Sequence, residues 1–251
     1  MKNKYFEQKK FVKNYIYAIT IFIITLVIGI SIFFNVVQSS VEKNSSETLI
    51  TNVTQQSEHL NTILNINYSY LNVLAQELSK SEDLFSENNI SLIKAFMENT
   101  DLNRTAIIDS DGNALYDNNV VKNVAHRRYF KESMQGKQSL SDPLESSVDQ
   151  QTRVILSVPI YKNNQVIGVV GGSYNVTKLG NMLFDDLFSG NGYSLIVTRE
   201  GKIVAHTGDP VDHKLSYGED IFTFYESKTT REGHSIGEVK QNFAMGEEGL
   251  V

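Results

Sequence analysis

A run of 23 residues without a charge, from Tyr15 to Val37, constrains this chain more than any other feature. About 20 apolar residues in a helix cross the roughly 30 Å of hydrocarbon in a bilayer. Five lysines and a single acid, Glu7, precede the run, and residues 38–42 after it contain no Lys or Arg. The positive-inside rule therefore predicts a cytoplasmic N-terminus at residues 1–14, a membrane helix at 15–37 and an extracytoplasmic domain after it.

A cleaved signal peptide is the alternative interpretation of this run. The apolar region of a signal peptide usually has about 7–15 residues and ends in an A-x-A-like site. Here the run is longer, and residues 35–40 after its core contain no Ala. The pattern favours an uncleaved anchor in the plasma membrane.

The composition beyond the anchor excludes several classes of function. Only one of the 29 acidic residues precedes the run, so the rest of the chain is strongly acidic, which argues against nucleic-acid binding. There is no Cys, and the five His form no metal-binding spacing. The sequence also lacks the motifs of hydrolases and of nucleotide-binding enzymes. We therefore predict no metal, no cofactor and no catalytic site in this chain.

A long amphipathic helix is predicted directly after the anchor. From Ser39 to about Lys80 there is no Pro or Gly. The apolar residues recur at helical spacing: Val53, Leu60, Leu64, Leu71, Leu74 and Leu78. Two interpretations stay open, because a passive stalk and a rod that carries movement into the membrane predict the same stripe.

The remaining chain alternates between strand and helix patterns. Strands are predicted at 104–109, 114–117, 152–161, 165–174, 193–198 and 203–206, and helices at 91–99, 127–135, 175–189, 222–225 and 236–243. The strand–turn–strand unit near residue 105 recurs after Gly190. We therefore predict an α+β fold with two modules, residues 38–189 and 190–251. Because residues 246–251 start another strand, we expect the second module to be incomplete and the chain to be a C-terminally truncated fragment.

The order of these elements resembles the double Cache sensor family of bacterial transmembrane receptors, over roughly residues 38–251. The resemblance implies that each of the two modules is a PAS-like antiparallel sheet, on a shared N-terminal helix. The motifs that carry the resemblance are Ile108–Gly112, His126–Phe130, Ser157–Tyr161, Val166–Gly172 and Tyr193–His206. Two further stretches, Gly171–Val176 and Phe222–Tyr225, are similar to sensors attached to diguanylate cyclase domains.

This resemblance implies a ligand pocket in the membrane-distal module. It would be lined by Tyr116, Arg127, Tyr129, Phe130, Ser173 and Tyr174. The guanidinium of Arg127 offers two parallel donors to a carboxylate, which points to a small organic acid. Ser173 stands where the amino-acid-binding members of the family carry an Asp. The residues alone also fit a plain alternative, in which Tyr129 and Phe130 are core residues and Arg127 is a solvated surface side chain.

The resemblance further implies a homodimeric receptor that passes ligand binding across the membrane. Its cytoplasmic output would be a diguanylate cyclase, with histidine kinase or chemotaxis outputs as alternatives. Two other classes stay open at this point: a membrane-anchored structural or adhesion protein, and an anchored extracytoplasmic enzyme.

Overall fold

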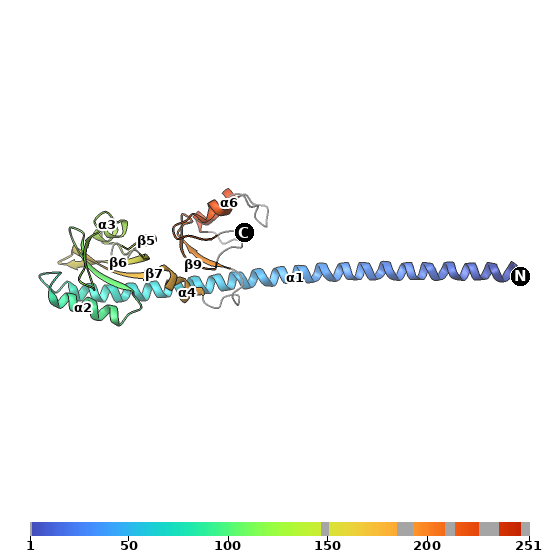
Figure 1. The fold of residues 1–251 in the computed structure, drawn as a ribbon, viewed down its shortest axis with the longest axis horizontal. Coiled ribbons are helices and arrows are strands. Elements are labelled where there is room, and N and C mark those ends of the chain that lie inside the picture. Colours follow the sequence, from blue (N-terminus) through green and yellow to red (C-terminus); the bar gives the residue numbers. More distant parts are fainter. Residues whose placement is uncertain (1, 147–150, 185–192, 209–213, 226–235, 247–251) are drawn as a thin grey trace. The chain divides into compact units, whose positions relative to one another are not determined.

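A computed structural model describes residues 2–146, 151–184, 193–208, 214–225 and 236–246. It divides into two compact units, Met1–Gln55 and Gln56–Val251, and Figure 1 labels the elements. The helices are α1 (Lys2–Leu78), α2 (Glu87–Glu98), α3 (Arg128–Met134), α4 (Val176–Phe184), α5 (Ile221–Tyr225) and α6 (Ile236–Met245). The strands are β1 (Arg104–Asp109), β2 (Asn113–Tyr116), β3 (Val121–Asn123), β4 (Ser139–Leu140), β5 (Leu144–Glu145), β6 (Thr152–Lys162), β7 (Gln165–Asn175), β8 (Ser194–Val197) and β9 (Ile203–Thr207).

The first unit consists of the N-terminal part of α1 and contains the apolar run. Every side chain from residue 15 to residue 37 is exposed. The polar members of the run bond back into the helix, because Thr20, Thr25 and Asn35 each donate to a carbonyl four residues earlier, at 2.9, 2.6 and 2.9 Å. Internal satisfaction of polar groups is what a hydrocarbon environment requires. By length and composition, this is the one helix in the described part of the chain that could cross a membrane.

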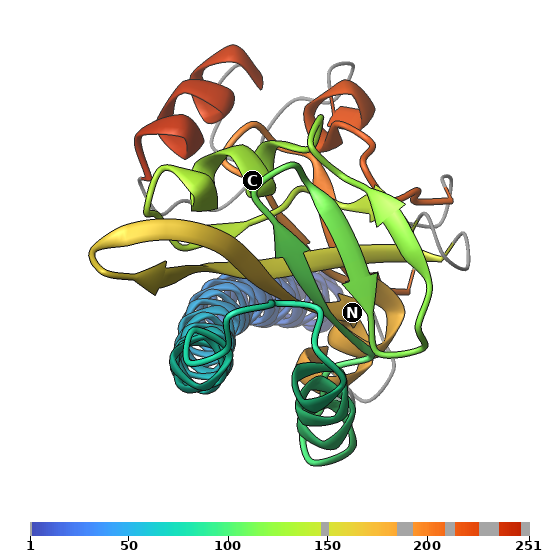
Figure 2. The ribbon, with the colours of Figure 1, turned by 90° about the vertical axis from the view of Figure 1, so that its left-hand side faces the viewer.

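The second unit is built on an antiparallel sheet in which neighbouring strands are not always consecutive in sequence. Its strands lie in the order β3-β2-β1-β7-β6-β4, and β5 also pairs with β6. Figure 2 shows the end of α1 and α2 on one face of this sheet and α3 on the other. The predicted α+β fold, with a long helix leading into antiparallel strands, is confirmed.

The core between the helices and the sheet follows the predicted apolar stripe of α1 from Leu60 onward, whereas Val53, the first predicted member of the stripe, is 66 % exposed. Leu71, Leu74 and Leu78 are each 3 % exposed or less. They pack with alternate residues of the strands, such as Ile107 of β1 and Leu156 of β6. Because side chains of a strand alternate between faces, the residues between these point to the opposite side of the sheet. The helix face of the sheet is therefore closed by a dry core.

Short polar caps set the boundaries of several elements. Ser86 caps α2 by accepting from the backbone N–H of Asn89, so this helix begins at Glu87, four residues before the predicted start. The β6–β7 turn places Asn163 and Asn164 at φ 51° and 63°, the left-handed region that a two-residue hairpin demands. These local signals fix the register of the two longest strands.

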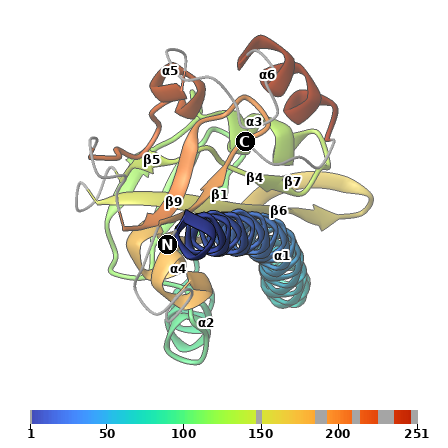
Figure 3. The same ribbon diagram turned by 90° about the vertical axis from the view of Figure 1, so that its right-hand side faces the viewer.

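A second, smaller sheet follows α4. Strands β8 and β9 pair antiparallel, as predicted for the repeated strand–turn–strand unit. Ile203, Leu215 and Phe222 form a separate small core beside them. Helix α4 packs directly on β9 (Figure 3), and a Cβ added at Gly180 would lie 2.8 Å from the carbonyl oxygen of His206. The predicted strand after residue 246 and the end of the helix predicted to residue 189 lie outside the described residues.

The close pairing of β7 with β1 leaves room for a side chain at one glycine of β7 and not at another. A Cβ at Gly168 would lie 2.5 Å from the carbonyl oxygen of Ile108, whereas a Cβ at Gly171 meets nothing nearer than 3.5 Å. We expect Gly168→Ala to cost about 1–3 kcal/mol of unfolding free energy. Gly171→Ala should be neutral or stabilise by up to about 1 kcal/mol, since it removes backbone entropy from the unfolded chain. Urea unfolding of the two variants in detergent would test this, and equal midpoints would contradict it.

Candidate ligand-binding site

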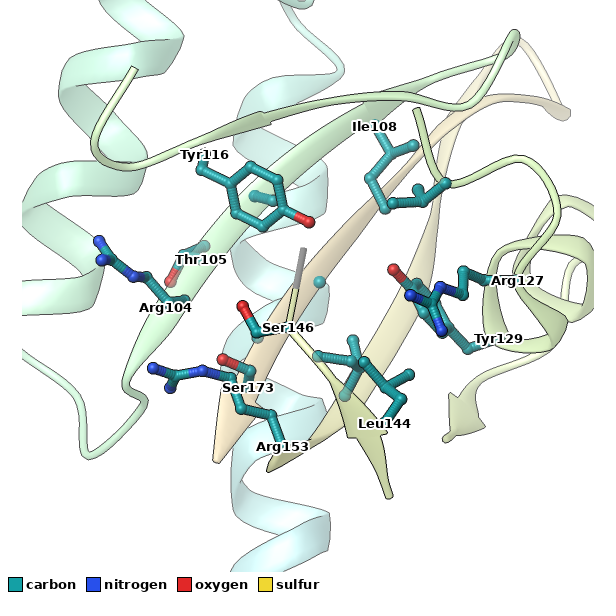
Figure 4. Close-up of a pocket in the computed structure, with 15 residues that line it drawn as sticks. Arg104, Thr105, Ile108, Tyr116, Arg127, Tyr129, Leu144, Ser146, Arg153 and Ser173 are labelled. Atoms are coloured by element: carbon teal, nitrogen blue, oxygen red, sulfur yellow. The ribbon is translucent and has the colours of Figure 1, made fainter. Parts of the chain in front are cut away.

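A cavity lies on the face of the main sheet that carries α3 (Figure 4). The register of the strands explains its floor. Ala106 of β1 pairs with Gly171 of β7, and Ser173 of β7 pairs with Ile155 of β6. These residues alternate with those of the helix-facing core, so they point away from α1. Gly171 contributes no side chain, which leaves space above the centre of the sheet.

Four of the six residues predicted from the sequence line this cavity, namely Tyr116, Arg127, Tyr129 and Ser173. They come from three separate parts of the fold: the end of β2, the start of α3 and the end of β7. Figure 4 shows Arg127 and Tyr129 on one side, with Tyr116 and Ser173 toward the middle. The structure thus brings together residues that are up to 57 positions apart in the chain.

Arg127 is the N-cap residue of α3 and has an extended backbone, with φ −73° and ψ 140°. Arg127 therefore lies just before the helix, where its half-buried side chain lines the cavity. Its guanidinium forms no ion pair within the described residues. Arg128 differs in both respects, because it is 58 % exposed and lies 3.3 Å from the carboxylate of Asp142. Of the two adjacent arginines, only Arg127 offers an unmatched charge to the cavity.

Two tyrosines, Tyr116 and Tyr129, contribute hydroxyl groups to the cavity. Tyr129 is 5 % exposed, and burial raises the pKa of its hydroxyl well above the usual value. The neighbouring Tyr116 also raises this pKa, and the Arg127 guanidinium partly lowers it. Tyr129 is neutral at physiological pH, as an ordinary tyrosine also is, and its hydroxyl can donate a hydrogen bond beside Arg127.

Buried serines hold α3 against the sheet. The hydroxyl groups of Ser133 in α3 and Ser157 in β6 lie 2.9 Å apart, and both residues are 0 % exposed. The hydroxyl of Ser139 in β4 donates to the carboxylate of Glu132 in α3. A buried and satisfied network of this kind rigidifies its surroundings. It fixes the helix that carries Tyr129 and follows Arg127.

The other two predicted residues lie outside the cavity. Phe130 is 6 % exposed and belongs to the small core under α3 with Val124 and Val169. Tyr174 faces the opposite side of the sheet, because it pairs with Val154 of the helix-facing core. Burial raises the pKa of the Tyr174 hydroxyl, and a hydrogen bond with the side chain of Asn67 in α1 partly offsets this. Tyr174 therefore connects the sheet to α1.

Two further arginines, Arg104 and Arg153, line the cavity, and neither was predicted from the sequence. Arg104 starts β1 and lies 3.3 Å from the buried carboxylate of Asp117. Arg153 lies near the start of β6, is 5 % exposed and donates to Gln151 at 3.0 Å. A charged residue at a buried strand position is the signal that could have marked both. Figure 4 shows them on the side of the cavity opposite Arg127.

The described residues that line the cavity include three arginines and no acid. The apolar members, Ile108, Val124, Leu144 and Ile155, form walls around the hydroxyl groups. A concave apolar site with a few convergent polar groups is the usual form of a small-molecule site. No cluster of three His, Cys, Asp or Glu side chains that could hold a metal ion occurs among the residues with a described position. The arrangement favours an anion.

Comparison with known proteins agrees with this architecture. Among solved structures, the sensory domain of the Campylobacter jejuni chemoreceptor Tlp3 with isoleucine bound is 15 % identical, with a TM-score of 0.56 over 67 % of this chain and 73 % of that one. The ligand-binding domain of Pseudomonas fluorescens CtaA in complex with L-leucine is 21 % identical, with a TM-score of 0.54 over 72 % of each chain. The ligand-binding domain of Pseudomonas aeruginosa PctC in complex with GABA is 16 % identical, with a TM-score of 0.52 over 61 % of this chain and 71 % of that one.

These similarities at low identity establish the fold. The family is established separately, by a match over most of the chain. The family model dCache_1, which describes a Cache domain, matches residues 35–247, so the chain belongs to the Cache domain family.

Proposed function

We propose that this chain is the extracytoplasmic sensing region of a membrane receptor and that it binds a small carboxylate in the cavity above the sheet. The observation that carries the proposal is the Arg127 guanidinium, which faces the cavity with no ion-pair partner in the described part of the chain. A half-buried guanidinium recognises a carboxylate through two parallel charge-assisted hydrogen bonds. Tyr116 and Tyr129 beside it supply hydroxyl groups to the same ligand.

The ligands of the structural relatives are consistent with a carboxylate. Isoleucine, L-leucine and GABA, bound to Tlp3, CtaA and PctC, each carry one. A carboxylate is the group that these three ligands share with an organic acid. The proposal for this chain therefore concerns the carboxylate.

The membrane topology is part of the same proposal. The lysines before the apolar run favour a cytoplasmic N-terminus, which would place the cavity outside the cytoplasm. Helix α1 runs without interruption from the apolar run to Leu78, which packs against the sheet that carries the cavity. Small shifts of about 1–2 Å between packed helices are a known switching mode. We propose that the ligand acts on α1 in this way within a homodimer.

As a Cache domain, the chain is a sensory region rather than a catalytic one. A cytoplasmic output would therefore have to be supplied outside these residues. The sequence pattern favours a diguanylate cyclase, whereas the structural relatives named above are sensory domains of chemoreceptors. Both outputs are compatible with the proposed ligand site.

Charge recognition can be tested with matched ligands on the whole chain in detergent micelles. We expect propionate, lactate or succinate to raise the melting temperature, and the corresponding primary amides to leave it unchanged. A ligand at 100 times its Kd stabilises the folded state by about 2.7 kcal/mol, which a thermal shift resolves. Equal shifts with acids and amides, or none with any acid in a broad panel, would refute the carboxylate site.

A further inference from the structure

We propose that the ligand is a hydroxy- or oxo-carboxylic acid, with an oxygen where an amino acid carries its ammonium, and that Ser173 is the residue that sets this preference. The inference rests on the proposed function, because it needs a carboxylate in the cavity. It goes further in assigning the second polar group of the ligand, at the end of the cavity opposite Arg127.

Ser173 presents a buried polar atom to the cavity. The residue is 3 % exposed, and its hydroxyl has no hydrogen-bond partner within the described part of the chain. It lies on the cavity face of β7, between Arg104 of β1 and Ile155 of β6. A buried hydroxyl without a partner is unfavourable, because it loses its hydrogen bonds to water. A ligand group that bonds to Ser173 would remove this cost.

The charges around Ser173 decide which kind of group can bind there. Arg104 pairs with Ser173 from β1, and Ile155 pairs with Ser173 from β6. Arg153 lies on β6 two residues before Ile155. Both arginines place a guanidinium group at this end, and the Asp117 carboxylate, 3.3 Å from Arg104, offsets part of that positive charge. No carboxylate among the described lining residues is present to bind an ammonium there, whereas a hydroxyl or carbonyl oxygen of the ligand can accept a hydrogen bond from Ser173.

The Asp117 carboxylate, which pairs with Arg104, is not available to an ammonium. Asp117 does not line the cavity, and its side chain is 4 % exposed. One of its oxygens lies 3.3 Å from Arg104, and the other accepts the backbone N–H of Thr105 at 3.2 Å. Both oxygens are thus engaged inside the sheet, and an ammonium would have to break a buried pair to reach them.

The two ends together define the ligand. Arg127 and Tyr129 lie on one side of the cavity, and Arg104 and Arg153 on the other, with Ser173 between them and the middle (Figure 4). A ligand carboxylate would pair with Arg127, and a ligand oxygen would accept a hydrogen bond from the Ser173 hydroxyl. An amino acid would also pair with Arg127, but it would place its ammonium beside Arg104 and Arg153.

Matched sets of ligands that differ only in this group test the inference. The sets are alanine, lactate and pyruvate; leucine, 2-hydroxy-4-methylpentanoate and 4-methyl-2-oxopentanoate; and GABA, 4-hydroxybutyrate and succinic semialdehyde. Titration calorimetry on the whole chain in micelles gives the affinities. In each set that binds, we expect the hydroxy or oxo acid to bind at least about tenfold more tightly than the amine.

Ser173→Asp should reverse this order, because it places a carboxylate where the oxygen is expected to bind. Ser173→Ala is the matched control, and it should weaken the oxygen ligands while keeping the order. Tighter binding of the amine by the unsubstituted protein, or an unchanged order in a folded Ser173→Asp variant, overturns the inference and leaves the carboxylate site standing. If no acid in any set binds, the proposed function fails first and the inference fails with it.

Discussion

Arg127→Ala should lower the affinity for a carboxylate ligand by about 10- to 150-fold, the largest effect expected of any single change in the cavity. A hydrogen bond to a charged group is worth about 1.5–3 kcal/mol, and each 1.4 kcal/mol is a factor of ten. Arg127 is half-buried at the start of α3 and has no ion pair within the described residues. Its truncation therefore removes the ligand's main partner without breaking an internal pair.

The adjacent arginine provides the control for this measurement. Arg128 is exposed, pairs with Asp142 and does not line the cavity, so Arg128→Ala should leave the affinity unchanged. Arg127→Lys should give an intermediate loss, since lysine keeps the charge but not the planar pair of donors. Calorimetry with the tightest acid from the panel would measure all three. If Arg128→Ala weakens binding as much as Arg127→Ala, the charge acts at long range and the assigned contact is wrong.

Leu71→Ala should lower the unfolding free energy by about 2–5 kcal/mol, the largest expected loss of stability. Leu71 is 0 % exposed and lies in the core that joins α1 to the sheet. The substitution leaves a cavity between the helix and strands such as β6. It removes part of the contact by which the sheet could act on α1.

Val73 lies two residues further along the same helix and is 60 % exposed. Val73→Ala should therefore change stability by no more than about 0.5 kcal/mol. Unfolding monitored by near-ultraviolet tyrosine circular dichroism would separate the two, because that signal follows tertiary packing rather than the long helix. Similar melting temperatures for both variants would show that α1 is not anchored in the core as the structure has it.

The sequence was sufficient for the longer elements and for four of the residues that line the cavity. Runs of apolar and β-branched residues on either side of an Asn-containing turn placed β6 and β7 within one residue of their observed ends. Strands β3, β4 and β5 were not predicted, because segments of two or three residues are too short to show a pattern. The alternation of side chains along a strand could have separated Ser173 from Tyr174, since neighbours on a strand point to opposite faces. Both were instead expected at one pocket.

The sequence by itself determined where the apolar helix runs, which face of α1 is buried, and that Arg127 stands at the start of a short helix. These are local properties, fixed by spacing and by residue type. The tertiary structure alone decided that Arg104 and Arg153, which are 49 positions apart, line the same cavity as Ser173. Their meeting depends on the strand order β1-β7-β6, which no local pattern encodes. The charge that we propose selects the ligand is therefore a product of strand pairing.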